Sequence, residues 1–194
     1  MPGTTRAEFD RLLQPILGVA YGTAVKLTGN RDDAQDLVQE ASVLAFRAFH
    51  QFEGGTNFKA WFFRILINRF YKDHAKNSRR APSVPIDEAE DLFLFQRLQN
   101  AGTSREGEDP LGTLFDQVDT GAVQSALEKL PEEFRSVAVL YFMNDFDYQQ
   151  IADVLEVPIG TVRSRLHRAR RLLQRALWQI ALDRGIVEEG VPLG

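Results

Sequence analysis

The chain has 194 residues, of which 44% are hydrophobic, and it carries a net charge of −4. This composition is typical of a folded protein with one medium domain or two small ones. The absence of cysteine excludes disulfides, thiolate metal sites and thiol nucleophiles, and it suits a reducing compartment.

The start of the chain lacks the basic and then apolar layout of a signal peptide. No apolar run is long enough to cross a membrane. We therefore expect a soluble, cytoplasmic protein without membrane insertion.

Charge is distributed unevenly along the chain. Residues 1–80 hold 12 basic and 8 acidic residues, residues 81–120 hold 2 and 9, and residues 121–194 hold 9 and 10. The central acidic segment also contains three of the eight prolines and a Gly, Ser, Thr and Glu cluster, which are linker signals. The predicted organisation is two folded pieces, 1–80 and 120–182, with an acidic linker at 81–119 and a tail at 183–194.

The first piece is predicted to be helical. From Asp33 to Phe49 apolar residues recur at intervals of three and four, as in a helix that faces a core, and Asn30 or Asp32 can cap its start. Residues 58–74 are apolar on nearly every side, which predicts a buried helix. The apolar positions of the earlier stripe are Ala34, Leu37, Val38, Ala41, Leu44, Ala45, Ala48 and Phe49.

The second piece is also predicted to be helical. The segment Leu130–Glu133 places a proline and two acids in the first turn of a helix, where both are favourable. Asp147 followed by Gln150 resembles a capping box that opens a helix over residues 148–155. No segment alternates like a strand, so the predicted class is all-α, with two small helical domains and a flexible linker. Within that linker, Asp91–Leu98 is expected to form a short docking helix.

The segment after residue 150 predicts a helix-turn-helix. A short helix with an apolar inner face leads through a turn to Pro158, which suits the start of the second helix. Glu156 lies in this turn, where a glycine is common, so the backbone there can differ locally. The apolar positions of the two helices are Ile151, Ala152, Leu155 and Val157, and then Val162, Leu166, Ala169 and Leu173.

The second helix of this motif is strongly basic. Six arginines lie between residues 163 and 175, and no acidic residue lies among them. A basic helix is often merely solvated, but the preceding helix and turn favour entry into the major groove of DNA. Arginine can pair with guanine edges there and clamp phosphates. The residues predicted to contact duplex DNA are Arg163, Ser164, His167, Arg168 and Arg171.

Three segments resemble the successive hallmark segments of bacterial sigma factors of the extracytoplasmic-function (ECF) group. They are DDAQDLVQEASVLAFRAF, FEGGTNFKAWFFRILINRFYKDHAKNSRR and LPEEFRSVAVLYFMNDFDYQQIADVLEVPIGTVRSRLHRARRLL. The resemblance covers residues 7–80 and 120–178, but not the linker or the tail. It implies two helical domains, regions 2 and 4, that direct core RNA polymerase to promoters. The segment GGTNFKAW is most similar to the same segment in members that respond to thiol or oxidative stress, and this resemblance implies a role in a stress response.

An acidic helix face in the first piece is a candidate docking surface. Asp36, Gln39 and Glu40 are spaced at i, i+3 and i+4 and share one exposed face, with Asp33 one turn earlier. Such a face alone is usually solvated, but the resemblance implies that it docks on the clamp helices of the polymerase β′ subunit. It also implies that the second domain contacts the β flap, and that promoter DNA and an anti-sigma factor are partners.

The predicted buried helix interleaves basic and aromatic residues. Aromatic residues most often belong to the core, and we hold to that for Phe62 and Phe70. The combination also suits an unpaired nucleic-acid strand, with cations for phosphates and rings for bases. The resemblance implies that the loop Gly54–Lys59 holds a flipped base and that Asn68 contacts the melted element. The predicted strand contacts are Asn57, Phe58, Lys59, Trp61, Arg64 and Asn68.

Signatures of an enzyme are missing from the sequence. His50, His74 and His167 lie far apart, and neither a phosphate-binding loop nor a G-x-S-x-G serine motif occurs. We expect no catalysis, no metal and no cofactor. A free-standing helix-turn-helix regulator and a protein-interaction module stay open as alternatives, although a regulator that binds DNA alone is expected to be more basic.

Overall fold

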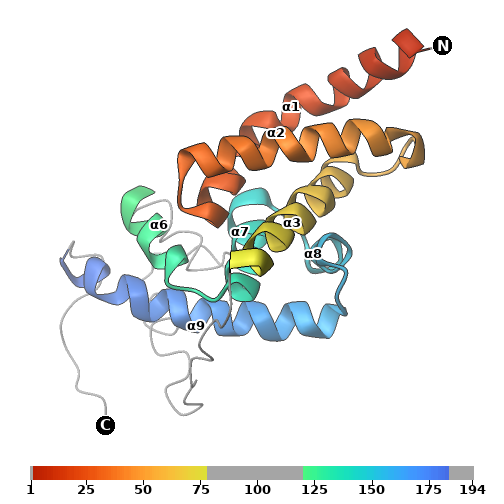
Figure 1. Ribbon diagram of the computed structural model, residues 1–194. Helices are drawn as coiled ribbons and strands as arrows, with labels where there is room; N and C mark the ends of the chain where they lie inside the picture. The colour runs from red at the N-terminus through yellow and green to blue at the C-terminus, as the bar shows by residue number, and fades with distance from the viewer. Residues whose placement is uncertain (1, 78–119, 184–194) are drawn as a thin grey trace. The chain divides into compact units, whose positions relative to one another are not determined.

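The computed structural model describes residues 2–77 and 120–183 (Figure 1). Every regular element within these ranges is a helix, which confirms the predicted all-α class. The predicted linker and its helix at Asp91–Leu98 lie outside the described residues, as does the tail beyond Asp183. None of the described helices is long and apolar enough to cross a membrane.

The chain divides into two units. Unit 1 comprises Met1–Ala81 and Val139–Ser164, and unit 2 comprises Pro82–Ala138 and Arg165–Gly194. Residues 139–164 therefore group with the first part of the chain, although their place in the sequence led us to assign them to the second predicted piece. The predicted domain boundaries stay a prediction.

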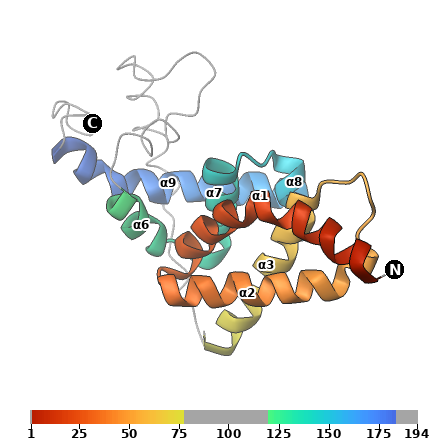
Figure 2. The same cartoon turned by 90° about the horizontal axis from the view of Figure 1, so that it is seen from above.

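Unit 1 is built around a helical hairpin. Helices α1 (Pro2–Thr28) and α2 (Arg31–Ala48) lie side by side in both views (Figure 1 and Figure 2). Gly29 makes the turn with φ of 72°, a left-handed conformation that glycine adopts without steric penalty. Asn30 then caps α2, because its side-chain oxygen accepts from the backbone N–H groups of Asp32 and Asp33 at 2.7 and 3.1 Å. Of the two predicted caps, the structure selects Asn30.

The remaining elements of unit 1 follow α2 and return late in the chain. A short 3₁₀ helix, η1 (Phe49–Gln51), leads to α3 (Phe58–Asn77). The unit also takes in the end of α7 (Glu132–Asn144), all of α8 (Tyr148–Leu155) and the first turns of α9 (Ile159–Asp183). The capping box at the start of α8 is confirmed, since Asp147 and Gln150 bond reciprocally at 2.8 and 3.0 Å.

The core of unit 1 lies where α2 and α3 pack together. The predicted stripe of α2 is buried at Ala34, Leu37, Val38, Ala41 and Ala45, and Phe49 follows it in η1. Two predicted positions differ, because Leu44 is 41% exposed on the flank of the helix and Ala48 is only half-buried. The predicted buried character of α3 is confirmed, and each large side chain contributes about 1.5–3 kcal/mol on burial. Its fully buried side chains are Phe62, Phe63, Leu66, Ile67 and Phe70.

Unit 2 contains α6 (Thr120–Glu128), the first half of α7 and most of α9. As predicted, Pro131 precedes α7, and Glu132 and Glu133 lie in its first turn. Arg135 closes the end of α6, because its guanidinium donates to the carbonyl oxygens of Leu127, Glu128 and Leu130 at 2.8–3.0 Å. Burial lowers the pKa of Arg135, while Glu132 and Glu128 act in the opposite direction.

Candidate nucleic-acid interface

The acidic face of α2 is open to solvent. Asp33, Asp36, Gln39 and Glu40 are all exposed, while Leu37 and Val38 between them are buried in the core. The burial of these two residues orients the four polar side chains outward. This geometry leaves the predicted docking face accessible in the described part of the chain.

A groove that the sequence did not predict borders this face. It measures about 480 Å³, and Arg69 of α3 contributes to it, with Nε 2.5 Å from Glu40 Oε2 and Nη2 2.8 Å from Asp73 Oδ1. The position of Arg69 could not be read from the sequence, because the contact joins two helices. The lining residues are Asp36, Gln39, Glu40, Val43, Leu44, Arg47 and Arg69.

Apolar side chains are also exposed beside the acidic face. Val43, Leu44 and Phe46 remain in contact with solvent, although all three are large and hydrophobic. A second groove of about 540 Å³ lies between α1 and α2 and includes Val43 and Phe46 in its lining. Exposed apolar surface beside charged residues is typical of a protein-binding surface. The sequence could have indicated this surface, because Val43 and Phe46 are hydrophobic but fall outside the apolar stripe of α2.

The predicted base-binding loop contains two residues with structural roles. Asn57 is exposed, and its side-chain oxygen accepts from the backbone N–H of Ala60 at 3.1 Å, as an N-cap of α3 does. Phe58 is only 7% exposed, and its ring packs on those of Phe9 and Phe52 at centroid distances of 6.0 and 5.3 Å. A base contact by Phe58 would require this aromatic cluster to open, so its ring serves the core in this structure.

Trp61 lies at the edge of the same cluster. Its ring is 5.3 Å from that of Phe52 and 5.6 Å from that of Phe58, and the residue remains partly exposed. Gly55 in the preceding loop has φ of 89°, which a residue with a side chain rarely adopts. Of the two predicted aromatic contacts, Trp61 is the one whose ring is accessible.

The three polar predicted contacts of α3 are half-buried, and each has a partner within unit 1. Lys59 Nζ donates to the backbone oxygen of Asn144 at 2.7 Å. Arg64 Nη1 lies 3.9 Å from Glu156 Oε1, and Asn68 Nδ2 donates to Glu156 Oε2 at 3.4 Å. Sequence reasoning missed these partners, because they are contributed by a segment far along the chain.

The helix-turn-helix forms as predicted from α8 and α9. Ile151, Ala152 and Leu155 are buried on α8, and Val154, which the prediction omitted, is buried as well. Glu156 forms the turn in a left-handed conformation with φ of 54° and ψ of 43°. The predicted stripe of α9 is confirmed, because Val162, Leu166, Ala169 and Leu173 are fully buried.

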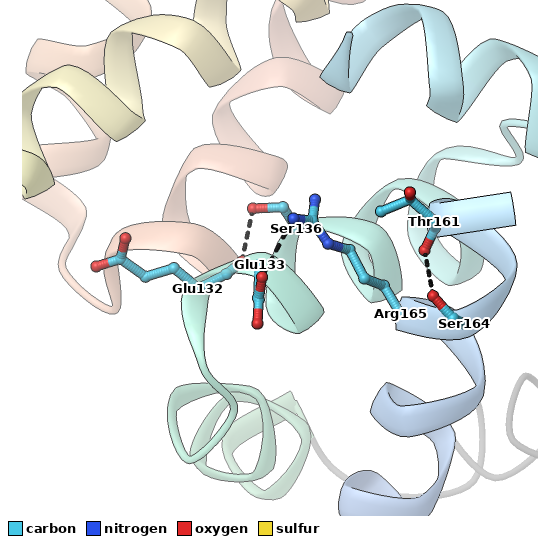
Figure 3. Close-up of polar contacts among 6 residues, drawn as sticks. All are labelled: Glu132, Glu133, Ser136, Thr161, Ser164 and Arg165. Carbon is cyan, nitrogen blue, oxygen red and sulfur yellow. Dashed lines mark hydrogen bonds and ion pairs between the residues drawn. The ribbon is translucent and has the colours of Figure 1, made fainter. Parts of the chain in front are cut away.

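Four of the five predicted duplex contacts lie on the exposed side of α9. They are Arg163, Ser164, His167 and Arg168, and the Ser164 hydroxyl also donates to the Thr161 carbonyl at 3.0 Å (Figure 3). Arg171 differs, because only 7% of it is exposed. Helical spacing assigns Arg171 to the same side as the other four, but spacing cannot show what else covers that side. The structure therefore does not present Arg171 on the open basic face.

A neighbouring arginine is used inside unit 2. Arg165 Nη2 lies 3.1 Å from Glu133 Oε2 at the start of α7 (Figure 3). In the same turn of α7, the Ser136 hydroxyl donates to the Glu132 carbonyl at 2.9 Å. Arg165 thus links α9 to α7, which separates it in role from the exposed arginines. No group of three or more potential metal-binding side chains occurs within the residues that the structure describes.

Comparison with known proteins agrees with this arrangement. The family model described as Sigma-70 region 2 matches residues 10–80, and the one described as Sigma-70, region 4 matches residues 120–173. The RNA polymerase sigma-H factor of Pseudomonas aeruginosa is 32% identical over 175 residues, which are 90% of this chain and 88% of that protein. The ECF RNA polymerase sigma-E factor of Escherichia coli K12 is 32% identical over 141 residues, 73% of this chain and 72% of that protein.

Solved structures give the same result. The sigma factor RpoE of Bartonella quintana, in complex with the anti-sigma factor NepR, is 29% identical, with a TM-score of 0.65 over 88% of this chain and 97% of that chain. CnrH, in complex with the cytosolic domain of CnrY, is 26% identical, with a TM-score of 0.59 over 90% of each chain. The chain belongs to the sigma-70 family and, within it, to the extracytoplasmic-function group of sigma factors.

Proposed function

We propose that this protein is a transcription initiation factor that binds core RNA polymerase, directs it to specific promoters and assists their melting. The observation that carries the proposal is the presence, in one chain, of an exposed acidic face on α2 and an exposed basic face on α9. A factor that recruits polymerase to DNA needs a surface of each kind, whereas a regulator that acts without polymerase needs only the second.

The acidic face is proposed to bind the clamp helices of the β′ subunit. Asp36, Gln39 and Glu40 offer carboxylate and amide groups to a basic partner, and the exposed Val43 and Phe46 add apolar surface at the same place. Charge complementarity speeds association, and burial of apolar side chains supplies much of the affinity of such an interface. An apolar surface of region 4 is proposed to contact the β flap.

The basic face is proposed to read the distal promoter element as duplex DNA. The side chains of Arg163, His167 and Arg168 point away from the buried stripe of α9, as a recognition helix in the major groove requires. Arg168 is the proposed base contact, because arginine can bond guanine O6 and N7 together. The hydroxyl of Ser164 is already bonded within the helix, so its proposed role is a secondary one.

The melted proximal element is proposed to bind along α3 and the loop before it. Trp61 offers an accessible ring for stacking, and Lys59, Arg64 and Asn68 offer donors on the same helix. Stacking on an aromatic ring and donors to the backbone are the two components of single-strand binding. Asn57 and Phe58 are used in the cap and the core, so we assign the strand contacts mainly to the other four.

An anti-sigma protein is a further proposed partner. The structure of RpoE supports it, since that sigma factor was determined in complex with the anti-sigma factor NepR. The proposed setting is the cytoplasm, where bacterial RNA polymerase acts, in a stress response and without catalysis by this chain.

Reconstitution with core polymerase tests the proposal. We expect the purified chain to co-elute with core polymerase and to support run-off transcription from a subset of fragments in a genomic library, with start sites that share upstream elements. Specific DNA binding without any effect of polymerase would instead identify a free-standing regulator. If the chain neither acts with core polymerase nor binds DNA specifically, a protein-interaction module is the function that remains.

A further inference from the structure

A single carboxylate in unit 1 bonds two of the groups proposed to capture the melted strand. Glu156 Oε1 lies 3.9 Å from Arg64 Nη1, and Glu156 Oε2 accepts from Asn68 Nδ2 at 3.4 Å. Arg64 and Asn68 lie one turn apart on α3, while Glu156 lies in the helix-turn-helix, 88 residues beyond Asn68. The contact therefore places the turn of the helix-turn-helix, which is proposed to read duplex DNA, against α3, which is proposed to bind the separated strand.

A second contact holds the same two segments together. Lys59 Nζ donates to the Asn144 carbonyl at 2.7 Å and lies 4.8 Å from the ring centroid of Phe146. Phe146 is buried and packs edge to face on Phe63 of α3 at 5.4 Å. Helices α3 and α8 consequently pack side by side within the unit (Figure 1).

Asn144 is itself fixed in the core of the unit. The hydroxyl of Thr23 on α1 donates to Asn144 Oδ1 at 3.0 Å, and Asn144 Nδ2 donates to the Val139 carbonyl at 3.0 Å. Both Thr23 and Asn144 are buried. The carbonyl oxygen that accepts from Lys59 Nζ therefore belongs to a residue with little freedom to move. In this structure three of the proposed strand contacts, Lys59, Arg64 and Asn68, are thus bonded to residues of the segment 144–156.

Glu156 is an unusual residue for its position. Its left-handed backbone conformation favours glycine, because a side chain there is sterically disfavoured. Its side chain is 58% exposed, so the ion pair is solvated and readily broken. A weak bond at a conformation that disfavours glutamate does little for the fold, which points to a role in function.

We propose that Glu156 is an autoinhibitory residue that competes with the melted promoter strand for Arg64 and Asn68. The proposal rests on the proposed function of α3 in strand capture. A carboxylate and a backbone phosphate are both anions that bond guanidinium groups, so Glu156 and a strand phosphate compete for Arg64 Nη1. The strand can bond Arg64 and Asn68 fully only after Glu156 moves away from α3. Strand capture therefore requires the contact between Glu156 and α3 to break.

Single-strand binding by the full chain tests the proposal. The probe is a fluorescent single-stranded oligonucleotide, and binding is measured by anisotropy at low salt for the wild type, Glu156→Gln and Glu156→Gly. We expect both variants to bind about two to five times more tightly, because an exposed ion pair contributes up to about 1 kcal/mol, or about fivefold in a binding constant. The gain should shrink at high salt, where the ion pair is screened.

The two variants separate the carboxylate from the backbone. Glu156→Gln removes the charge and keeps the side chain at the left-handed position, whereas Glu156→Gly also removes the strain. A gain in the glycine variant alone would assign the effect to the backbone and overturn the proposal. Asp153→Asn is the matched control, because Asp153 is exposed on α8 and bonds Gln149 of the same helix. Equal gains in this control would show a general effect of net charge and would also overturn the proposal.

Transcription in the reconstituted system distinguishes the two levels of inference. If the wild type supports no polymerase-dependent initiation, the proposed function is wrong, and Glu156 has no promoter strand to compete with. If the wild type initiates normally but neither Glu156 variant binds the oligonucleotide more tightly than Asp153→Asn, only the autoinhibitory role fails. Thermal unfolding of all three variants verifies that each one is folded.

Discussion

Arg69 of α3 forms an ion pair with Glu40 of α2 across the surface of unit 1, with 2.5 Å between Nε and Oε2. The Glu40 side chain is half-exposed, so the carboxylate is oriented by Arg69 without being removed from solvent. Such a pair contributes little to stability, about 0–1 kcal/mol. Its effect is to hold one acidic group of the candidate docking face in place.

Charge reversal on that face should abolish polymerase binding. The change is Asp36→Lys with Glu40→Lys, and the physical reason is repulsion by a basic partner together with loss of the orienting bond from Arg69. We expect the melting temperature to change by only a few degrees, since both side chains are exposed. Co-elution with core polymerase is the measurement.

A control with the same change in net charge makes this result specific. Glu8→Lys with Glu53→Lys alters two exposed positions outside the grooves of α2. The control should retain polymerase binding. Normal binding by the Asp36 and Glu40 variant would remove the docking assignment.

Truncation of Arg168 should weaken binding to the distal promoter element. Arg168→Ala is expected to cost about 1–3 kcal/mol and to relax the preference for one base pair, as loss of a bidentate guanine contact does. Binding by polymerase holoenzyme is compared on the cognate element and on single-base variants. A uniform loss on every sequence would indicate a phosphate contact, and no loss at all would place Arg168 away from the groove.

Truncation of Arg171 should affect folding more than DNA recognition. Its side chain is buried, so Arg171→Ala removes packing around a nearly inaccessible position, at about 1–3 kcal/mol. Arg168→Ala is the comparison, because the same substitution at an exposed position should change the melting temperature little. Equal melting temperatures in the two variants would contradict the structural role of Arg171.

Removal of the Asn68 side chain should impair promoter melting selectively. Asn68→Ala leaves α2 and the exposed face of α9 unchanged, so polymerase assembly and duplex recognition should persist. Open-complex formation should fall, because a flipped base costs a few kcal/mol that strand contacts must offset. Permanganate footprinting on duplex DNA measures the loss.

A template with a pre-melted bubble provides the internal control for Asn68→Ala. It removes the cost of unpairing, so it should restore part of the signal. If the variant melts duplex DNA fully, strand capture must be assigned to Lys59 and Arg64 instead of Asn68.

Loss of Arg135 should destabilise region 4. Arg135→Ala leaves the carbonyl oxygens of Leu127, Glu128 and Leu130 without this donor. The bonds to Leu127 and Leu130 are partly buried, and an unpaired buried acceptor costs about 1–3 kcal/mol. Arg135→Lys should recover only part of the loss, because one ammonium group cannot reproduce the fork of a guanidinium. Denaturant unfolding measures both variants, and an unchanged midpoint in Arg135→Ala would show that water replaces the donor.

The sequence by itself determined the helices and their buried faces. Apolar spacing predicted the inner faces of α2 and α9, and capping residues predicted the starts of α7 and α8, because both signals act within a few residues of the chain. The exposure of Asp36 and Arg168 followed from the same spacing, since a side chain opposite a buried stripe faces outward. Local chemistry was therefore sufficient for the class of fold and for the two candidate faces.

Only the tertiary structure decided which predicted residues remain accessible. Phe58 and Arg171 have the right residue types and positions for nucleic-acid contacts, but both side chains are buried. Leu44 has the spacing of a core residue and is exposed, and Glu156 lies against Arg64 of α3. These outcomes depend on packing between segments far apart in the sequence, and helical periodicity carries no information about what packs against a given face.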